Sequence, residues 1–277
     1  VWVVGSSRSQ AALAPDLDAL LAELAPGAAA SIAYPAREPV TDRARARGAV
    51  FSDARIASLV NPGTAGGALV DSAPIAGLDE TTQAGLVDLL AANVFSGSGA
   101  HSFYKRIWGA ALAYSGYMSV SPRAGRMHVY SDRCADLPAL MRFIDGEVRA
   151  APVDPRFVDY AVANSFGART GDAFEDRAAS MARDLVEGVT PARVRAFRER
   201  LLALRTRPGL AEAIHARLVP VYSAVAPSLA PGEPIPAGAL WFTIGPEARL
   251  ARYEDALRAA RGEDVSMLRL YPRDFWL

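Results

Sequence analysis

The sequence has 277 residues, of which 51% are hydrophobic and 22% are charged, and its 30 basic and 30 acidic residues give a formal net charge of zero. This composition suits a chain that buries a sizeable core, and it argues against intrinsic disorder. The balanced charge predicts no general attraction to nucleic acid or to an anionic membrane surface.

Residue usage gives a few further bounds. Lys105 is the only lysine, and this arginine bias is typical of GC-rich coding, so we expect a bacterial protein. The single cysteine, Cys134, cannot form an intrachain disulfide, so the bacterial cytoplasm and the periplasm both remain open. No uncharged apolar run approaches the roughly 20 residues of a membrane span, and no signal-peptide pattern is present.

The first residues predict a fragment of a preceding unit. A strand-like run over 1–4 is followed by a helix over Asp16–Leu24, and the order strand, glycine, helix returns in residues 239–260. We therefore expect residues 1–30 to be the tail of a preceding, related half, in a piece cut from a longer protein. Residues 31–48, which contain TDRARARG, predict an exposed linker, and residues 49–277 predict the main domain.

The middle of the chain predicts strands and a hairpin between helices. Two strands are expected over 56–60 and 68–75, and residues 79–82 offer N-cap candidates for a helix that runs to about Phe95. Apolar and polar residues alternate over 112–121 and again over 127–130, and turn residues separate the two runs. Helical spacing returns at Leu137, Met141, Ile144 and Val148.

The last part of the chain predicts several helices and one late strand. Helices are expected from Asp154, over 174–187, after Thr190 and over 209–219, and a strand and helix are expected over 239–260. The order of these elements predicts an α+β fold. It would be a two-layer sandwich in which helices pack on one face of a mixed, antiparallel-rich sheet.

A family resemblance lies in the run SFYKRIWGAALAYSGYMSV. Its Ser102, Phe103, Tyr104, Arg106 and the segment Ala111–Ser115 resemble the pattern S-x-L-[FY]-x-x-[IL]-R…G-L-A-Y-S. That pattern is found in the non-zinc, C-terminal half of the M16 zinc metallopeptidases, the pitrilysin and mitochondrial-processing-peptidase group. Two departures stand out: the pattern's glycine is Ala111, and Arg106 lies one residue further from Tyr114.

The resemblance implies a function for this chain together with a partner. In the family, the Arg and Tyr of the motif help to hold the peptide substrate, which carries over to Arg106 and Tyr114. The chain would then be inactive alone and would contain no cofactor, because zinc would be bound by a partner half on the same or another polypeptide. The alternative is a degenerate scaffold or assembly subunit with no peptidase role.

The histidines do not supply a zinc motif. Zinc peptidases of this kind need two histidines one helical turn apart and a glutamate. His101, His128 and His215 are far apart in the sequence, and none has a second histidine within a turn. The zinc-binding half is therefore expected elsewhere.

Two weaker motifs have ordinary explanations. Ser102 and Lys105 form a Ser-x-x-Lys pair, as in penicillin-recognising acyl enzymes, but a Lys-Thr-Gly strand is impossible with a single lysine. The alternative is that Ser102 caps a short helix and Lys105 is solvated. The glycine-rich segments Asn61–Gly67 and Gly97–Gly99 lack the residues of a phosphate-binding loop and predict turns.

Overall fold

The computed structural model describes residues 3–24, 39–49, 55–167, 173–229, 231–232, 235–262 and 265–275. The chain divides into two compact units. The first unit combines Val1–Glu38 with Gly167–Pro191, and the second combines Pro39–Phe166 with Ala192–Leu277.

The first unit contains two helices. Helix α1 (Ser7–Glu23) begins earlier than the predicted Asp16, because Ser6 acts as N-cap and its hydroxyl accepts a hydrogen bond of 3.1 Å from the Ser9 amide. Residues 3 and 4 are not in a strand, and residues 1–2 lie outside the described part of the chain. Helix α7 (Phe174–Val186) matches the predicted 174–187, with acidic residues in its first turn.

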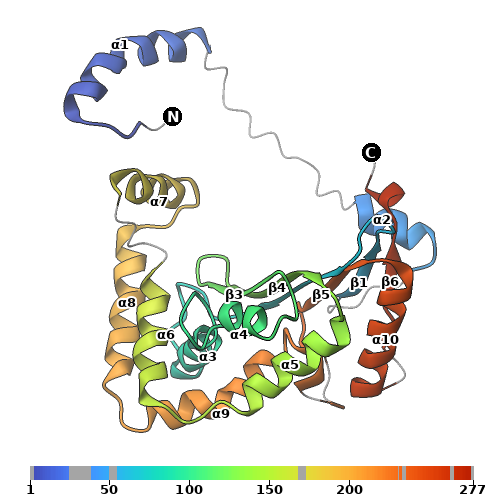
Figure 1. Cartoon of the computed structure of the whole chain (residues 1–277). Helices are drawn as coiled ribbons and strands as arrows, with labels where there is room; N and C mark the ends of the chain where they lie inside the picture. Colours follow the sequence, from blue (N-terminus) through green and yellow to red (C-terminus); the bar gives the residue numbers. More distant parts are fainter. Residues whose placement is uncertain are drawn as a thin grey trace. The chain divides into compact units, whose positions relative to one another are not determined.

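The second unit is built on a six-stranded mixed sheet with the order β3-β4-β2-β5-β1-β6 (Figure 1). The strands are β1 (Arg55–Val60), β2 (Gly67–Pro74), β3 (Ser115–Ser121), β4 (Arg126–Cys134), β5 (Leu240–Gly245) and β6 (Leu268–Leu270). β1 is parallel to β5 and β6, whereas the β2–β4, β2–β5 and β3–β4 pairs are antiparallel. The predicted α+β class with an antiparallel-rich sheet is confirmed.

Helices cover one face of this sheet, where α3 (Gln83–Asn93) and α4 (Phe103–Gly109) contact β3, α5 (Leu137–Arg149) contacts β2, and α10 (Glu247–Arg261) contacts β5 and β1. The other helices that begin or lie in this unit are α6 (Pro155–Gly167), α8 (Pro191–Arg205) and α9 (Leu210–Tyr222), and α9 packs on α3 and α5. Short 3-10 turns lie at Pro227–Leu229 (η1) and Pro272–Asp274 (η2). The strands bury Leu69, Met118, Met127, Val129 and Trp241 against this layer. The alternation read from the sequence therefore becomes one apolar sheet face under helices.

Helix α9 continues past the residue at which it was predicted to stop. Pro220 lies inside its last turn, and the helix ends at Tyr222. The Tyr222 ring is fully buried, and its hydroxyl donates to the Ala92 carbonyl at 2.7 Å and accepts from the Phe95 amide at 3.3 Å. These tertiary contacts outweigh the helix-breaking tendency of proline.

The segment expected to be a linker contains a helix that belongs to the core. Residues 31–38 lie outside the described residues, but α2 (Pro39–Ala46) follows directly. Its Ala44 is fully buried and packs with Ala57 of β1 and Leu270 of β6, so α2 covers that end of the second sheet face. Among the described residues, no helix has both the length and the apolar character needed to cross a membrane.

Candidate functional site

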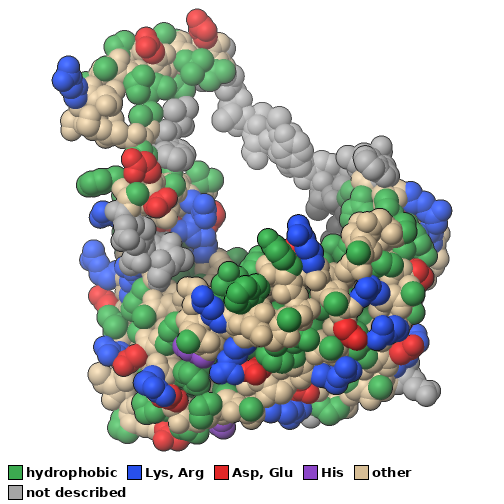
Figure 2. All heavy atoms as spheres, viewed as in Figure 1, with side chains coloured by type: hydrophobic (Ala, Val, Ile, Leu, Met, Phe, Trp, Pro, Cys, Tyr) green, Lys and Arg blue, Asp and Glu red, His purple; other side chains and the backbone are tan. Residues whose placement is uncertain are grey.

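The second face of the sheet is partly exposed between β3 and β5. Cross-strand register places together the side chains that alternate with the buried ones. We call this set the open face: Ala68, Val70, Ser72, Ser115, Tyr117, Ser119, Arg126, His128, Tyr130, Asp132, Leu240, Phe242 and Ile244. Figure 2 shows hydrophobic side chains at the surface near β3. This mixture of phenols, hydroxyls and apolar groups is chemically suited to contacting a peptide.

Tyr114 lies directly before β3, which is an edge strand. Its side chain is 65% exposed, and its backbone amide donates to the Asp132 carbonyl at 3.3 Å. The strand begins later than the predicted residue 112, so Tyr114 does not join the buried side of β3 formed by Gly116 and Met118. Its hydroxyl is thus accessible to a ligand.

Arg106 lies on α4 and has a partner on another helix. Its guanidinium forms an ion pair with the Glu147 carboxylate of α5. The side chains of Arg106 and Glu147 are 38% and 21% exposed. Arg106 therefore links two helices of the helical layer, and the guanidinium that lies over the Tyr114 ring is that of Arg133, at 4.5 Å from the ring centroid.

Ala111 shows why the motif favours glycine at its position. Its φ is 53°, a left-handed conformation that L residues other than glycine adopt at a cost. The Ala111 amide donates to the Trp108 carbonyl at 3.0 Å and the Leu112 amide to the Ile107 carbonyl at 3.2 Å, which closes the end of α4. This turn connects α4 to Tyr114 and β3.

A β-bulge near the end of β4 presents Arg133. The register shifts between Gly67 and Leu69 of β2, so that Asp132 and Arg133 together lie opposite one residue of that strand. Arg133 has a φ of 46° and is exposed. Arg133 is not a residue that the sequence pattern predicts as functional. Ser131 and Cys134 are both buried, although two residues instead of one lie between them. Strict alternation of apolar and polar residues therefore cannot locate the bulge.

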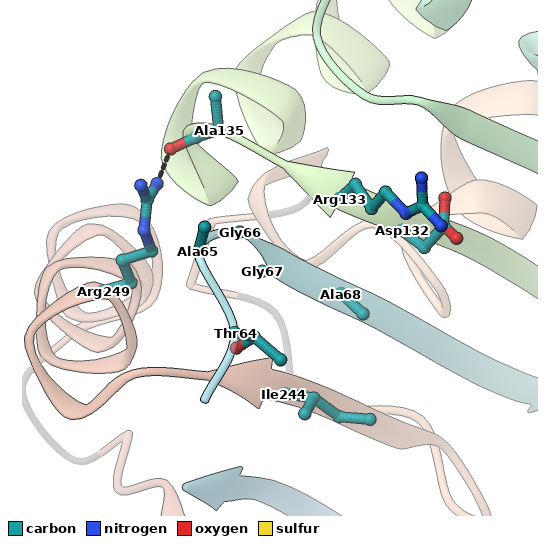
Figure 3. Close-up of a pocket in the computed structure, with 10 residues that line it drawn as sticks. All are labelled: Thr64, Ala65, Gly66, Gly67, Ala68, Asp132, Arg133, Ala135, Ile244 and Arg249. Atoms are coloured by element: carbon teal, nitrogen blue, oxygen red, sulfur yellow. Dashed lines mark hydrogen bonds between the residues drawn. The ribbon is translucent and has the colours of Figure 1, made fainter. Parts of the chain in front are cut away.

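The bulge and the loop before β2 enclose a pocket of about 640 Å³. The residues that line it are Thr64, Ala65, Gly66, Gly67, Ala68, Asp132, Arg133, Ala135, Ile244 and Arg249. Figure 3 shows Arg249 and Arg133 on opposite sides of Gly66 and Gly67, and the Arg249 guanidinium donates to the Ala135 carbonyl. A Cβ on Gly66 would lie 3.1 Å from the Arg133 backbone, which is tighter than most Cβ contacts, so this close approach favours glycine.

The environment on β4 favours the neutral forms of Tyr130 and His128. Burial and the neighbouring Asp132 carboxylate raise the pKa of Tyr130, whose ring lies 5.0 Å from that of Tyr117. Burial, and then the Arg126 charge, lower the pKa of His128. The Asp132 carboxylate accepts hydrogen bonds from the Ser115 hydroxyl at 2.6 Å and the Ser115 amide at 3.1 Å, and these bonds hold the carboxylate against β3.

The histidines lie in separate environments. His101 stacks edge-on against Tyr160, His128 is on the open face, and His215 hydrogen bonds through Nε2 to the Ala151 carbonyl at 2.9 Å. In the described part of the chain, no group of three His, Cys, Asp or Glu side chains could hold a metal ion. The described side chains therefore do not fit a zinc centre.

Ser102 cannot act as an accessible nucleophile in this structure. It is fully buried, and Lys105 is exposed with its ammonium 5.7 Å from the Tyr104 ring centroid. Ser102 does occupy the N-cap position of α4, but its side chain makes no capping hydrogen bond. The cap prediction was thus right in position and wrong in the bond.

Comparison with known proteins gives structural neighbours only. No protein-family model matches the chain, and no curated protein sequence matches it. Solved structures with a similar arrangement include a peptidase M16 inactive domain from Pseudomonas fluorescens, at 12% identity and a TM-score of 0.44 over 70% of this chain and 43% of that one. A protease from Helicobacter pylori has 13% identity and a TM-score of 0.46, over 70% of this chain and 44% of that one.

A third neighbour is the periplasmic protease PqqL from Escherichia coli, at 13% identity and a TM-score of 0.41 over 72% of this chain and 21% of that one. The chain spans less than half the length of each of these three structures. One of them is named as an M16 domain, the family that residues 102–115 resemble. At these identities and TM-scores, the similarities assign neither an activity nor a substrate to the chain.

Proposed function

We propose that this chain is the non-catalytic, substrate-contacting half of an M16-type zinc peptidase. The open face and Tyr114 would bind a peptide in a chamber that a zinc-bearing half completes. The chain would have no hydrolytic activity alone. The partner half would supply the metal that activates water, on the same polypeptide or as a separate subunit.

The observation that carries the proposal is the exposure of Tyr114 within the motif. Its side chain is 65% exposed at the start of an edge strand, next to a sheet face on which phenols and hydroxyls are accessible. A phenol can donate a hydrogen bond to a peptide carbonyl or to the oxyanion that forms when water attacks it. Support also comes from the left-handed Ala111, which stands where the family motif has glycine.

The alternative is a scaffold subunit without a peptidase role. It is favoured by the exposed apolar side chains of α7, which suit protein contacts: Phe174, Met181, Leu185 and Val186. Both functions use a protein partner, but only the peptidase role needs the Tyr114 hydroxyl.

Reconstitution distinguishes the two functions. The chain is mixed with a zinc-bearing M16 half, and cleavage of a quenched fluorescent peptide is measured with and without a chelator. We expect zinc-dependent cleavage that falls about tenfold or more in Tyr114→Phe, a loss of at least about 1.4 kcal/mol of transition-state stabilisation. Tyr104→Phe, an exposed tyrosine on α4, is the matched control and should leave the rate unchanged. A reconstituted mixture without zinc-dependent cleavage would favour the scaffold, and cleavage at equal rates in both variants would remove Tyr114 from the proposed site.

A further inference from the structure

We infer that Arg133, and not the motif residue Arg106, is the guanidinium that works with Tyr114, and that it binds a carboxylate of the peptide. The inference rests on the proposed function and adds a substrate preference to it. The preferred ligand is a peptide that carries either an acidic side chain or a free C-terminal carboxylate at the pocket beside Arg133.

Arg106 already has a charged partner within the chain. Its guanidinium pairs with Glu147 of α5, so a peptide carboxylate would have to displace a charged partner that is already in place. Breaking this ion pair would leave Glu147, whose side chain is only 21% exposed, without its counter-charge. Arg106 is therefore suited to holding α4 on α5.

Arg133 is available to a ligand. It is exposed and lies over the Tyr114 ring, and within the described ranges it forms no ion pair. The neighbouring Asp132 carboxylate is engaged by Ser115. A guanidinium stacked on an aromatic ring keeps its in-plane N–H donors free, and these match the two oxygens of a carboxylate.

The backbone at Arg133 has an unusual conformation. A non-glycine residue with a φ of 46° is costly, and here the bulge in β4 and the close packing of Gly66 maintain it. Such conformations concentrate at binding and catalytic sites, where they aim a side chain. Glycine would adopt this backbone conformation with less strain. A role for the arginine side chain would explain why arginine stands here instead.

A pocket adjoins Arg133. Its volume of about 640 Å³ can take a peptide side chain or terminus, and Ala68 and Ile244 give it apolar walls beside the Arg133 stem. Arg249, on the opposite side, is engaged with the Ala135 carbonyl. A carboxylate that enters from the Tyr114 side therefore meets Arg133 first.

The test measures binding of rhodamine-labelled Ala/Ser peptides to the chain alone by fluorescence anisotropy. The probes are a C-terminally amidated peptide with one central Glu, the same peptide with Gln, and the Gln peptide with a free C-terminus. We expect the first or third probe to bind about tenfold more tightly than the neutral one, and the stronger of the two identifies the source of the carboxylate. Added salt should reduce this preference.

Variants assign the preference to a residue. Arg133→Gln should abolish it, and so should Arg133→Gly, in which glycine adopts the left-handed backbone without steric strain. Arg106→Gln and the exposed control Arg195→Gln should retain it. A preference that survives in Arg133→Gln, or that disappears in Arg106→Gln, overturns the inference, and so does a wild-type chain that binds no probe or binds all three equally. Reconstituted cleavage that depends on Tyr114 without any carboxylate preference would leave the proposed function standing and the inference refuted.

Discussion

The guanidinium of Arg106 on α4 forms an ion pair with the carboxylate of Glu147 on α5. Because both side chains are partly buried between two helices, we expect their coupling to exceed that of a fully exposed pair. In a double-mutant cycle with Arg106→Gln and Glu147→Gln, urea unfolding should give a coupling free energy of about 0.5–1 kcal/mol.

The matched control for this cycle is the Arg205–Asp159 pair, whose side chains are 53% and 63% exposed. Its coupling should be smaller, about 0–0.5 kcal/mol, since solvent screens both charges. If Arg106 and Glu147 show no coupling while Arg106→Gln removes peptide binding, Arg106 acts on the substrate and not on the helix pair.

Replacing Ala111 with glycine should stabilise the protein. The φ of 53° costs an alanine about 1 kcal/mol or more, whereas glycine adopts it freely. Part of the gain is lost because glycine makes the unfolded chain more flexible, so the free energy of unfolding should rise by about 0.5–1 kcal/mol. Urea or thermal unfolding measures the change.

Ala110→Gly is the control for that substitution. Ala110 precedes Ala111 and has an ordinary φ of −84°. Glycine there relieves no strain, so it should be destabilising by about 0.5 kcal/mol. Destabilisation by Ala111→Gly as well would mean that the left-handed turn at the end of α4 is not formed in solution.

Sequence patterns predicted which helices and strands form better than they predicted which strands lie next to one another in the sheet. Alternation located β4, and helical spacing located α5 and α8, because each has one face that packs on the core. The insertion of β5 between β1 and β2 could not be predicted, since strand order depends on pairings between residues distant in the chain. Helix α2 was missed because it buries only Thr41 and Ala44, which are too small to mark an apolar face.

The candidate site was predictable only in part. The motif pointed to Tyr114, and the structure places its side chain in solvent. Whether Arg106 faces the substrate depends on Glu147, which lies on another helix and has no counterpart in the motif. Arg133 depends on an extra residue in one strand, and a bulge of this kind interrupts the very alternation from which strands are recognised.

Helix α2 should prove to be part of the folded core. Ala44 is fully buried against Ala57 and Leu270, so Ala44→Asp would bury a charge with no partner built for it. We expect the free energy of unfolding to fall by about 3 kcal/mol in urea titrations. Ala46→Asp, at an exposed position of the same helix, should change it by less than about 0.5 kcal/mol. Equal, small effects would indicate a linker.

A buried carboxyl in the sheet should make stability fall as pH rises. Asp71 of β2 is fully buried beneath the helices, and its Oδ1 accepts a hydrogen bond from the Phe242 amide at 3.1 Å. Burial raises the pKa of Asp71 well above its ordinary value, so the folded state keeps a proton that the unfolded state loses above about pH 4. Stability therefore decreases with pH from there until the folded pKa is reached.

Asp71→Asn isolates this effect, because the amide oxygen can still accept from Phe242 and has no proton to lose. The free energy of unfolding of the variant minus that of the wild type should increase from pH 4 to pH 8, by at most about 1.4 kcal/mol per pH unit. Asp79→Asn should show the opposite trend, and only below about pH 4. A hydrogen bond from Arg193 lowers the pKa of Asp79, so the wild type gains stability as pH rises from the folded pKa to the unfolded pKa near 4 and the variant does not; from about pH 4 to pH 8 the difference should stay constant. A pH-independent difference for Asp71→Asn would mean that Asp71 is ionised in the folded state and that water or a cation reaches the interior of the sheet.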